Sequence, residues 1–347
     1  MTELAKQTNP RQTWIDSLRG FGIILMLIGH SMVGENIKHF IYGFHMPLFF
    51  VISGYLFDIK HEEDIRHFIK RKWKAYMVPY FVMCTCNLLL TIPLEFIAGT
   101  RGTNLIESIG KHIFWILYSF GEADMMPMCS PLWFLPCLFL ASLYLYYYSK
   151  LGAIFKVVIA VAIFMFDWLL QDMDITQLPW HFDIAMVAML IMYCGYAIRQ
   201  FNLLQYIKVY SIAICFIIGI VSIYLNTKVD LVHRQYGNLL LFAVGSMAVC
   251  IALTALFKSF INKELCLAWI GRNSMWFMGA NLMVNFILNE MFEYLSTAVD
   301  RSFYVWWINV ILNFALISVW ICIWKKMHAL GKRRHTILHQ RSENTLE

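Results

Sequence analysis

The sequence predicts an all-α polytopic membrane protein with about ten transmembrane helices and with both the N- and C-termini cytoplasmic. Three observations support this prediction. Of the 347 residues, 60% are hydrophobic and 14% are charged, whereas soluble chains have about 45–50% apolar and about 25% charged residues. Apolar stretches of about 20 residues, the length that crosses the hydrocarbon core, recur along the whole chain. The basic residues gather in alternate loops.

The predicted spans are apolar stretches in which ionised residues are rare. They cover residues 15–34, 41–58, 75–98, 131–149, 153–170, 182–199, 207–226, 238–258, 266–289 and 303–324. A further stretch, Ile113–Phe120, is too short to cross and is expected to lie in the membrane interface. We therefore expect one transmembrane domain over residues 1–325. A basic cytoplasmic tail, residues 326–347, should follow it and lie beside anionic lipid headgroups.

The distribution of Lys and Arg sets the orientation. With the N-terminus in the cytoplasm, 20 of the 28 basic residues lie on the cytoplasmic side and 6 on the other, while Arg19 and Arg272 fall within spans. An even number of spans satisfies the positive-inside rule in every loop. The first span lacks a small-residue cleavage site and carries charge, so we expect it to remain as an anchor. The expected location is the bacterial inner (cell) membrane.

Composition also excludes other classes of protein. The net charge of +6 is small, and the basic clusters lie beside apolar runs, so nucleic-acid binding is not expected. The nine cysteines lie almost entirely in spans, and none forms a CxxC pair. Neither a disulfide framework nor a zinc site is supported, and we expect no metal.

Two polar residues of the first span, Arg19 and His30, are not required by the topology. They lie eleven positions apart, which is about 16 Å of helical rise and almost three whole turns, so both side chains should share one helix face. Taken singly, Arg19 could reach the inner headgroups and His30 could be an interfacial histidine. Together on one face, with glycines nearby, they favour a polar pathway lined by this helix.

The second predicted span brings another histidine, His45, to the same external side as His30. Two imidazoles at one membrane depth could share a proton or position a hydroxyl for attack. The alternative is an interfacial ring bonded to backbone near Pro47. Ser53 and Gly54 are expected to let helices pack closely, because Ser53 lies about two turns from His45 and so lacks an adjacent base.

Three further groups of residues each allow two interpretations. The basic loop ending at Lys70–Lys74 can be a headgroup-binding belt, or its Lys and Arg side chains can hold the phosphates of an anionic cofactor. On the external side, Trp133, Trp180 and His181 can be interfacial belt residues or can stack on a sugar. Glu95 is an intramembrane charge for which the sequence identifies no partner.

These motifs resemble the integral-membrane acyltransferase-3 family, and most closely its fucose 4-O-acetylase-like branch. The resemblance covers about residues 10–325. It is carried by Arg19 and His30 with ten residues between them, followed by Phe49-Phe50-x-x-Ser53-Gly54. Further matches are the Lys70–Tyr80 stretch, Leu132-Trp-Phe-Leu135, Leu178-Pro-Trp180 and Ile270-Gly-Arg-Asn-Ser274. One departure is Gly279-Ala-Asn281, where the family often has a histidine; Asn281 and Asn285 are the polar residues nearby.

The resemblance implies an enzyme that transfers an acetyl group from cytoplasmic acetyl-CoA to a hydroxyl of a cell-surface or lipid-linked glycan. By the same resemblance, His30 matches the essential histidine and Arg19 its basic partner. Arg71 and Lys74 match the basic cluster that meets the cofactor phosphates. The residues and the resemblance together fit one mechanism, in which Arg19 is a further anchor for the cofactor and His45 is the supporting imidazole. In it, Trp133, Trp180 and His181 would contact the acceptor.

A different class of protein also uses intramembrane Arg and His residues with external aromatics. This class is the transporter or flippase of a lipid-linked glycan or small anion. The sequence shows no inverted repeat, no paired broken helices and no regular series of midplane carboxylates, which such carriers commonly have. The enzyme is therefore the favoured prediction, and the carrier is the alternative.

Overall fold

The fold was analysed in a computed structural model, which describes residues 12–58, 64–97, 102–121, 129–173, 178–261, 266–299 and 305–343. These residues are helical almost throughout. Within them, extended pairing is confined to one isolated bridge between Asp230 and Gln235. The expected all-α class is thus confirmed over the described part of the chain.

The helices in chain order begin with α1 (Thr13–Gly29), α2 (Glu35–Tyr42), α3 (His45–Tyr55), α4 (Ile65–Lys72), the π-helix η1 (Trp73–Met77), α5 (Val78–Ile97) and α6 (Thr103–Tyr118). They continue with η2 (Ser130–Trp133), α7 (Phe134–Tyr148), α8 (Ala153–Asp172), η3 (Pro179–His181), α9 (Phe182–Gln200), η4 (Leu203–Tyr206) and α10 (Val209–Leu225). The last are η5 (Leu231–His233), α11 (Leu239–Phe260), α12 (Cys266–Arg272), α13 (Ser274–Val299) and α14 (Trp306–Glu343).

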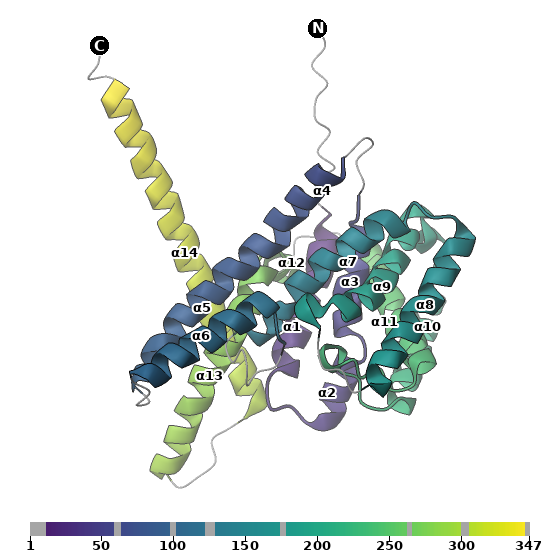
Figure 1. The fold of residues 1–347 in the computed structure, drawn as a ribbon, viewed down its shortest axis with the longest axis horizontal. Coiled ribbons are helices and arrows are strands. Elements are labelled where there is room, and N and C mark those ends of the chain that lie inside the picture. The colour runs from purple at the N-terminus through teal and green to yellow at the C-terminus, as the bar shows by residue number, and fades with distance from the viewer. Residues whose placement is uncertain are drawn as a thin grey trace.

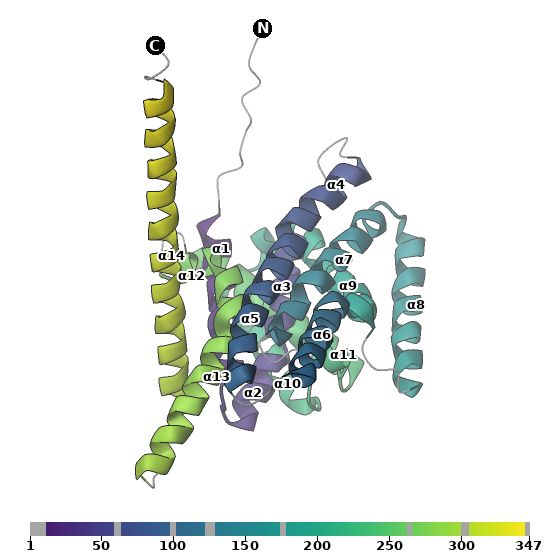
Figure 2. The same cartoon turned by 60° about the vertical axis from the view of Figure 1, so that its left-hand side comes forward.

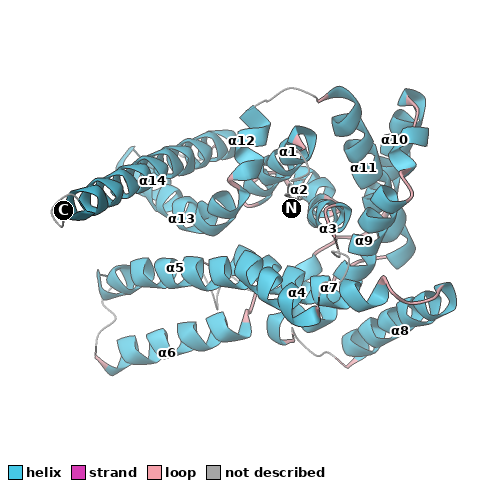
Figure 3. Ribbon diagram, turned by 90° about the horizontal axis from the view of Figure 1, so that it is seen from above, coloured by secondary structure: helices cyan, strands magenta, loops and turns pink. Residues whose placement is uncertain are grey.

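In the view from above (Figure 3), the other helices lie around a central group made of α1, α2 and α3. Figure 1 shows α14 extending well beyond the other helices. In Figure 2, α8 stands at the edge of the molecule, where it packs on α9. Viewed from above in Figure 3, α12 and α13 lie on one side of the central group and α4 and α7 lie on the other. The central helices therefore lie between α12 and α13 on one side and α4 and α7 on the other.

Six helical segments of the described chain are long and apolar enough to cross a membrane, which makes this a multi-span integral membrane protein. They are Ile65–Pro93, Ser130–Tyr148, Ala153–Leu170, Pro179–Gln200, Leu239–Phe260 and Trp306–Leu330. The other predicted spans also hold helices, in the expected order, but these are shorter or broken; α1 and α10 have 17 residues each and α3 has 11. The number ten and the side of the termini remain predictions.

Two predicted spans are interrupted rather than continuous. In the range 41–58, α2 ends at Tyr42 and α3 begins at His45, with Phe44 in a non-helical conformation between them. In the range 266–289, α12 ends at Arg272 and α13 begins at Ser274. Apolar composition alone does not reveal either break, because it records which residues avoid water and not where the backbone changes direction.

Two other helices extend beyond the apolar stretches from which the spans are predicted. The third span begins at Ile65 rather than residue 75, since α4, η1 and α5 follow one another without a gap. Likewise α14 runs from Trp306 to Glu343, so the expected boundary at residues 325/326 lies inside a helix. Basic residues are good helix formers, and a helix can leave the membrane without ending.

Glycines set the closest helix contacts. A Cβ on Gly54 would collide with the backbone oxygen of Met192, and one on Gly195 would collide with that of Val51, so α3 and α9 touch along their backbones. The same kind of contact joins α1 to α12, where Gly271 meets the backbone oxygen of Asp16. The expected packing role of Gly54 is confirmed. Close approach of this kind is typical of small residues in membrane helices.

Candidate active site

A cavity of ≈ 640 Å³ opens within the central group of helices. Its walls come from α1, α2, α3, η1, η2, the start of α7, the α12–α13 break with the start of α13, and the loop between α10 and α11. Residues that reach it include Arg19, Arg272, Tyr76, Phe49, Trp133, Met278, His30, His45, Asp230 and His233. Segments from both halves of the chain therefore contribute to one site.

One end of the cavity is basic. Arg19 lies one turn from Asp16 on α1, with 4.0 Å between Nη1 and the carboxylate oxygen Oδ1. Arg272 comes from α12, and its neighbour Gly271 lies against the backbone of Asp16 and Gly20. The tight α1–α12 contact thus brings two guanidinium groups, distant in sequence, to the same end of the cavity. Guanidinium groups bind phosphate and carboxylate through paired hydrogen bonds.

The middle of the cavity is apolar. Ile23 and Met26 come from α1, Phe49 from α3, Leu138 from α7 and Met278 from α13. Methionine side chains adapt to irregular surfaces and suit a passage for a flexible chain. The cavity therefore joins a basic end to the opposite end through a hydrophobic stretch.

His30 lies at the opposite end, where α1 stops. Its backbone follows the last turn of α1, with N–H donating to the carbonyl of Met26 at 3.0 Å. Two neighbouring elements hold this end: Asn285 Nδ2 of α13 donates to the His30 carbonyl at 3.0 Å, and the Tyr42 hydroxyl donates to the Gly29 carbonyl at 3.3 Å. The prediction that Arg19 and His30 share one face is confirmed, because both line the cavity.

His45 lies at the start of α3, is buried, and reaches the same cavity. Its Nδ1 is 2.9 Å from the carbonyl oxygen of Ile41, so Nδ1 carries the proton and Nε2 is the basic nitrogen. The Tyr42 ring lies beside it, with ring centroids 5.1 Å apart. This hydrogen bond to the backbone comes from α2, the helix that precedes the one containing Pro47. His30 and His45 are therefore brought together as expected.

The three residues predicted to meet an acceptor on the external side have different surroundings in the structure. Trp133 lines the cavity. His181 is fully buried behind it, with ring centroids 4.7 Å apart, and supports the indole. Trp180 points away, donating from Nε1 to the Leu117 carbonyl at 2.7 Å and packing near Trp73. Neither Trp180 nor His181 lines this cavity, so an acceptor role for them stays a prediction.

The predicted cofactor residues Arg71 and Lys74 do not line the cavity either. Arg71 donates to the Asp58 carbonyl at 3.3 Å and lies over the Phe68 ring. Lys74 is exposed on η1. Their neighbour Tyr76 does reach the cavity from the same π-helix. Such helices add one residue per turn and often occur at functional sites. The part of Arg71 and Lys74 in binding a cofactor stays a prediction.

Three cavity residues with charged or imidazole side chains lie outside the set that the sequence predicts: Arg272, Asp230 and His233. Arg272 had a usable signal, since it was one of the two basic residues inside predicted spans. Asp230 and His233 had none, because they belong to an ordinary-looking polar loop. Their place at the His30 end depends on how α10 and α11 pack around α2 and α3.

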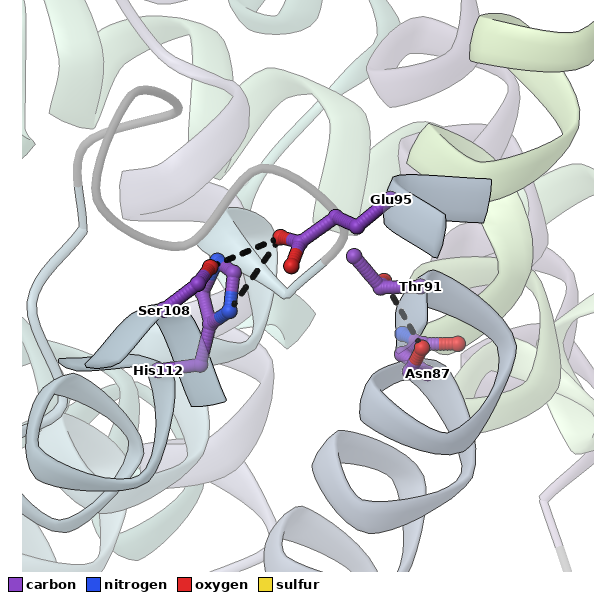
Figure 4. Close-up of polar contacts among 5 residues, drawn as sticks. All are labelled: Asn87, Thr91, Glu95, Ser108 and His112. Atoms are coloured by element: carbon purple, nitrogen blue, oxygen red, sulfur yellow. Dashed lines mark hydrogen bonds and ion pairs between the residues drawn. The ribbon is translucent and has the colours of Figure 1, made fainter. Parts of the chain in front are cut away.

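Glu95, for which the sequence identified no partner, finds two on α6 (Figure 4). Its Oε1 accepts from the Ser108 hydroxyl at 3.0 Å and lies 3.6 Å from His112 Nδ1. The helix that carries these partners, Thr103–Tyr118, is longer than the interfacial stretch expected from its apolar part. This polar contact fastens α6 to α5, apart from the cavity.

The fold and site define a class: an integral membrane protein whose helices enclose a cavity with arginines at one end and imidazoles at the other. Comparison with known proteins gives the family. The acyltransferase-3 family model, described as an acyltransferase domain, matches residues 12–327. The chain belongs to this family and is a membrane acyltransferase. No curated protein and no solved structure gives a significant match.

Proposed function

We propose that the protein is a membrane O-acetyltransferase of the fucose 4-O-acetylase-like branch. It moves an acetyl group from cytoplasmic acetyl-CoA to a hydroxyl of a cell-surface or lipid-linked glycan, in the bacterial inner membrane. The observation that carries the proposal is the cavity, which has Arg19 and Arg272 at one end and His30 and His45 at the other. Family membership supports acyl transfer over the carrier alternative.

The donor fits the cavity in chemistry and in length. CoA carries phosphates, which the guanidinium groups of Arg19 and Arg272 would bind at the cytoplasmic end. Its pantetheine arm is slender and would pass the apolar middle. The eleven residues from Arg19 to His30 span about 16 Å on a helix, which is about the reach of such an arm. The thioester would then lie beside His30.

Acetyl transfer needs a base or a nucleophile next to that thioester. His30 can act as general base on the acceptor hydroxyl or attack the carbonyl carbon to form an acetyl-imidazole. His45, with its proton held on Nδ1 by the Ile41 carbonyl, presents a basic nitrogen from the adjacent helix. Trp133 lines the cavity and offers an aromatic face for a sugar ring.

The proposed binding of the donor's phosphates is tested by comparing CoA with dephospho-CoA, which lacks the 3′-phosphate. Binding to purified protein should weaken for dephospho-CoA and for Arg19→Ala or Arg272→Ala. The conservative Arg272→Lys variant should retain part of the affinity, since it keeps charge but loses the paired geometry. Equal affinity of all these proteins for CoA would refute the phosphate site.

The transfer half is tested in proteoliposomes with radiolabelled acetyl-CoA and a panel of methyl hexosides. The enzyme should release free thiol and label the sugar. In a parallel assay with a labelled glycan, uptake of the intact glycan without thiol release would instead support a carrier. Arg71→Ala, tested for CoA binding alongside, shows whether the basic residues outside the cavity contribute.

A further inference from the structure

The loop between α10 and α11, Asn226–Asn238, is folded into a fixed shape at the His30 end of the cavity. Asn226 closes it: its Nδ2 donates to the Tyr236 carbonyl at 2.9 Å, and its Oδ1 accepts from the Asn238 N–H at 2.7 Å. Asp230 and Gln235 exchange two backbone hydrogen bonds of 2.7 and 2.9 Å. We call this segment the mouth loop.

The mouth loop is tied to the helices by a buried ion pair. Arg234 is 6% exposed and its Nη1 lies 3.2 Å from Oδ2 of Asp183, near the start of α9. Arg234 adopts a left-handed conformation with φ 55°, which a non-glycine residue takes only at a cost of about 1 kcal/mol or more. Val232 of the same loop packs so closely against Gly121 that a Cβ on Gly121 would collide with the Val232 side chain. The loop is thus held in place from both sides.

This anchoring presents a carboxylate and an imidazole to the cavity. Asp230 and His233 both line it, and Nδ1 of His233 lies 3.1 Å from Oδ2 of Asp230. A carboxylate at Nδ1 fixes the tautomer and orientation of an imidazole, so Nε2 becomes its basic nitrogen. The His233 side chain is 42% exposed, which places this pair where a water-soluble acceptor would enter.

We propose that His233, oriented by Asp230, is the general base that accepts the proton of the acceptor hydroxyl. The proposal rests on the acetyl transfer proposed above, and it assigns His30 the role of acetyl carrier. Three imidazoles share this end of the cavity: His30 and His45 come from the central helices, and His233 comes from the mouth loop. In this arrangement His30 holds the acetyl group and His233 accepts the proton.

The reaction balances in two steps. In the first, a ring nitrogen of His30 attacks the thioester carbonyl carbon, a C–N bond forms, the C–S bond breaks, and the ring's extra proton goes to the CoA thiolate. In the second, the acceptor oxygen attacks the acetyl carbon, its proton moves to Nε2 of His233, a C–O bond forms and the C–N bond breaks. The proton then passes to the released His30 nitrogen, which restores both rings.

The test compares two acceptors in proteoliposomes: a methyl hexoside, which needs a base, and hydroxylamine, which attacks acyl groups without one. His233→Ala and His233→Gln should lower transfer to the hexoside by about 10²-fold or more, while enzyme-dependent formation of acetohydroxamate stays near the wild-type rate. Added imidazole should restore part of the hexoside activity in His233→Ala. Asp230→Asn should act in the same direction, and Asp230→Glu should recover part of the loss.

The outcomes separate this inference from the proposed function. Full hexoside transfer by His233→Gln, or an equal fall with both acceptors in His233→Gln and His233→Ala, would overturn the assignment of the base. If the wild-type protein acetylates neither acceptor in a His30-dependent way, the proposed function itself fails. The variant His39→Ala is the matched control, because His39 bonds to the Ile223 carbonyl nearby and does not line the cavity.

Discussion

Replacement of Asn285 by Ala tests how the protein holds the end of α1. Asn285 makes two hydrogen bonds: it donates to the His30 carbonyl and accepts from Asn313 on α14 at 3.1 Å. Such bonds in membrane proteins contribute about 0.6 kcal/mol each, so the free energy of unfolding should fall by about 1 kcal/mol. The rate should fall much further, because a displacement of about 1 Å at a reacting group can cost about 10²-fold.

The assay is thiol release from acetyl-CoA in proteoliposomes, with thermal unfolding in detergent measured on the same preparations. The matched control is Asn289→Ala, one turn further along α13, which removes the acceptor of the Asn309 amide; Asn289 does not line the cavity. It removes one hydrogen bond, so it should lose about 0.6 kcal/mol of stability and retain its activity. Equal losses of activity in the two variants would refute the claim that Asn285 positions His30.

Three further predictions concern packing, the donor site and α6. Gly54→Ala should destabilise the fold by about 3 kcal/mol through its collision with the α9 backbone, whereas Gly110→Ala, with open space around its Cβ, should be neutral or stabilising; thermal unfolding of both decides this. Arg272→Ala should raise the KM for acetyl-CoA more than it lowers kcat, and an unchanged KM would place the phosphates elsewhere. Glu95→Gln should loosen α6, seen as faster proteolysis or hydrogen exchange there, with thiol release intact; a loss of activity without loosening would argue that the pair with His112 acts in the chemistry.

The sequence predicts those parts of the site that lie on one helix. Arg19 and His30 share a face because eleven residues make almost three turns, and that relation survives however the helices pack. The small size of Gly54 likewise predicts a close contact, though not that its partner is Met192. Both depend on local geometry, which the chain itself specifies.

The parts of the site that depend on long-range packing were not predictable. Arg272 lines the same cavity as Arg19 because two glycines let α1 and α12 touch, and His233 reaches the cavity because Arg234 pairs with a residue of another helix. Hydropathy also places the third span without showing that it starts at Ile65 or contains a π-helix. Periodicity reports the face of a helix, and it carries no information on which helices become neighbours.

The most direct test of the account is His30→Ala beside His39→Ala, with labelled acetyl-CoA and hydroxylamine in proteoliposomes. Hydroxylamine needs no base, so the measurement reports on acetyl transfer itself. The account predicts that His39→Ala forms acetohydroxamate like the wild-type enzyme and that His30→Ala, correctly folded, forms none above background. Undiminished acetohydroxamate formation by His30→Ala would contradict it.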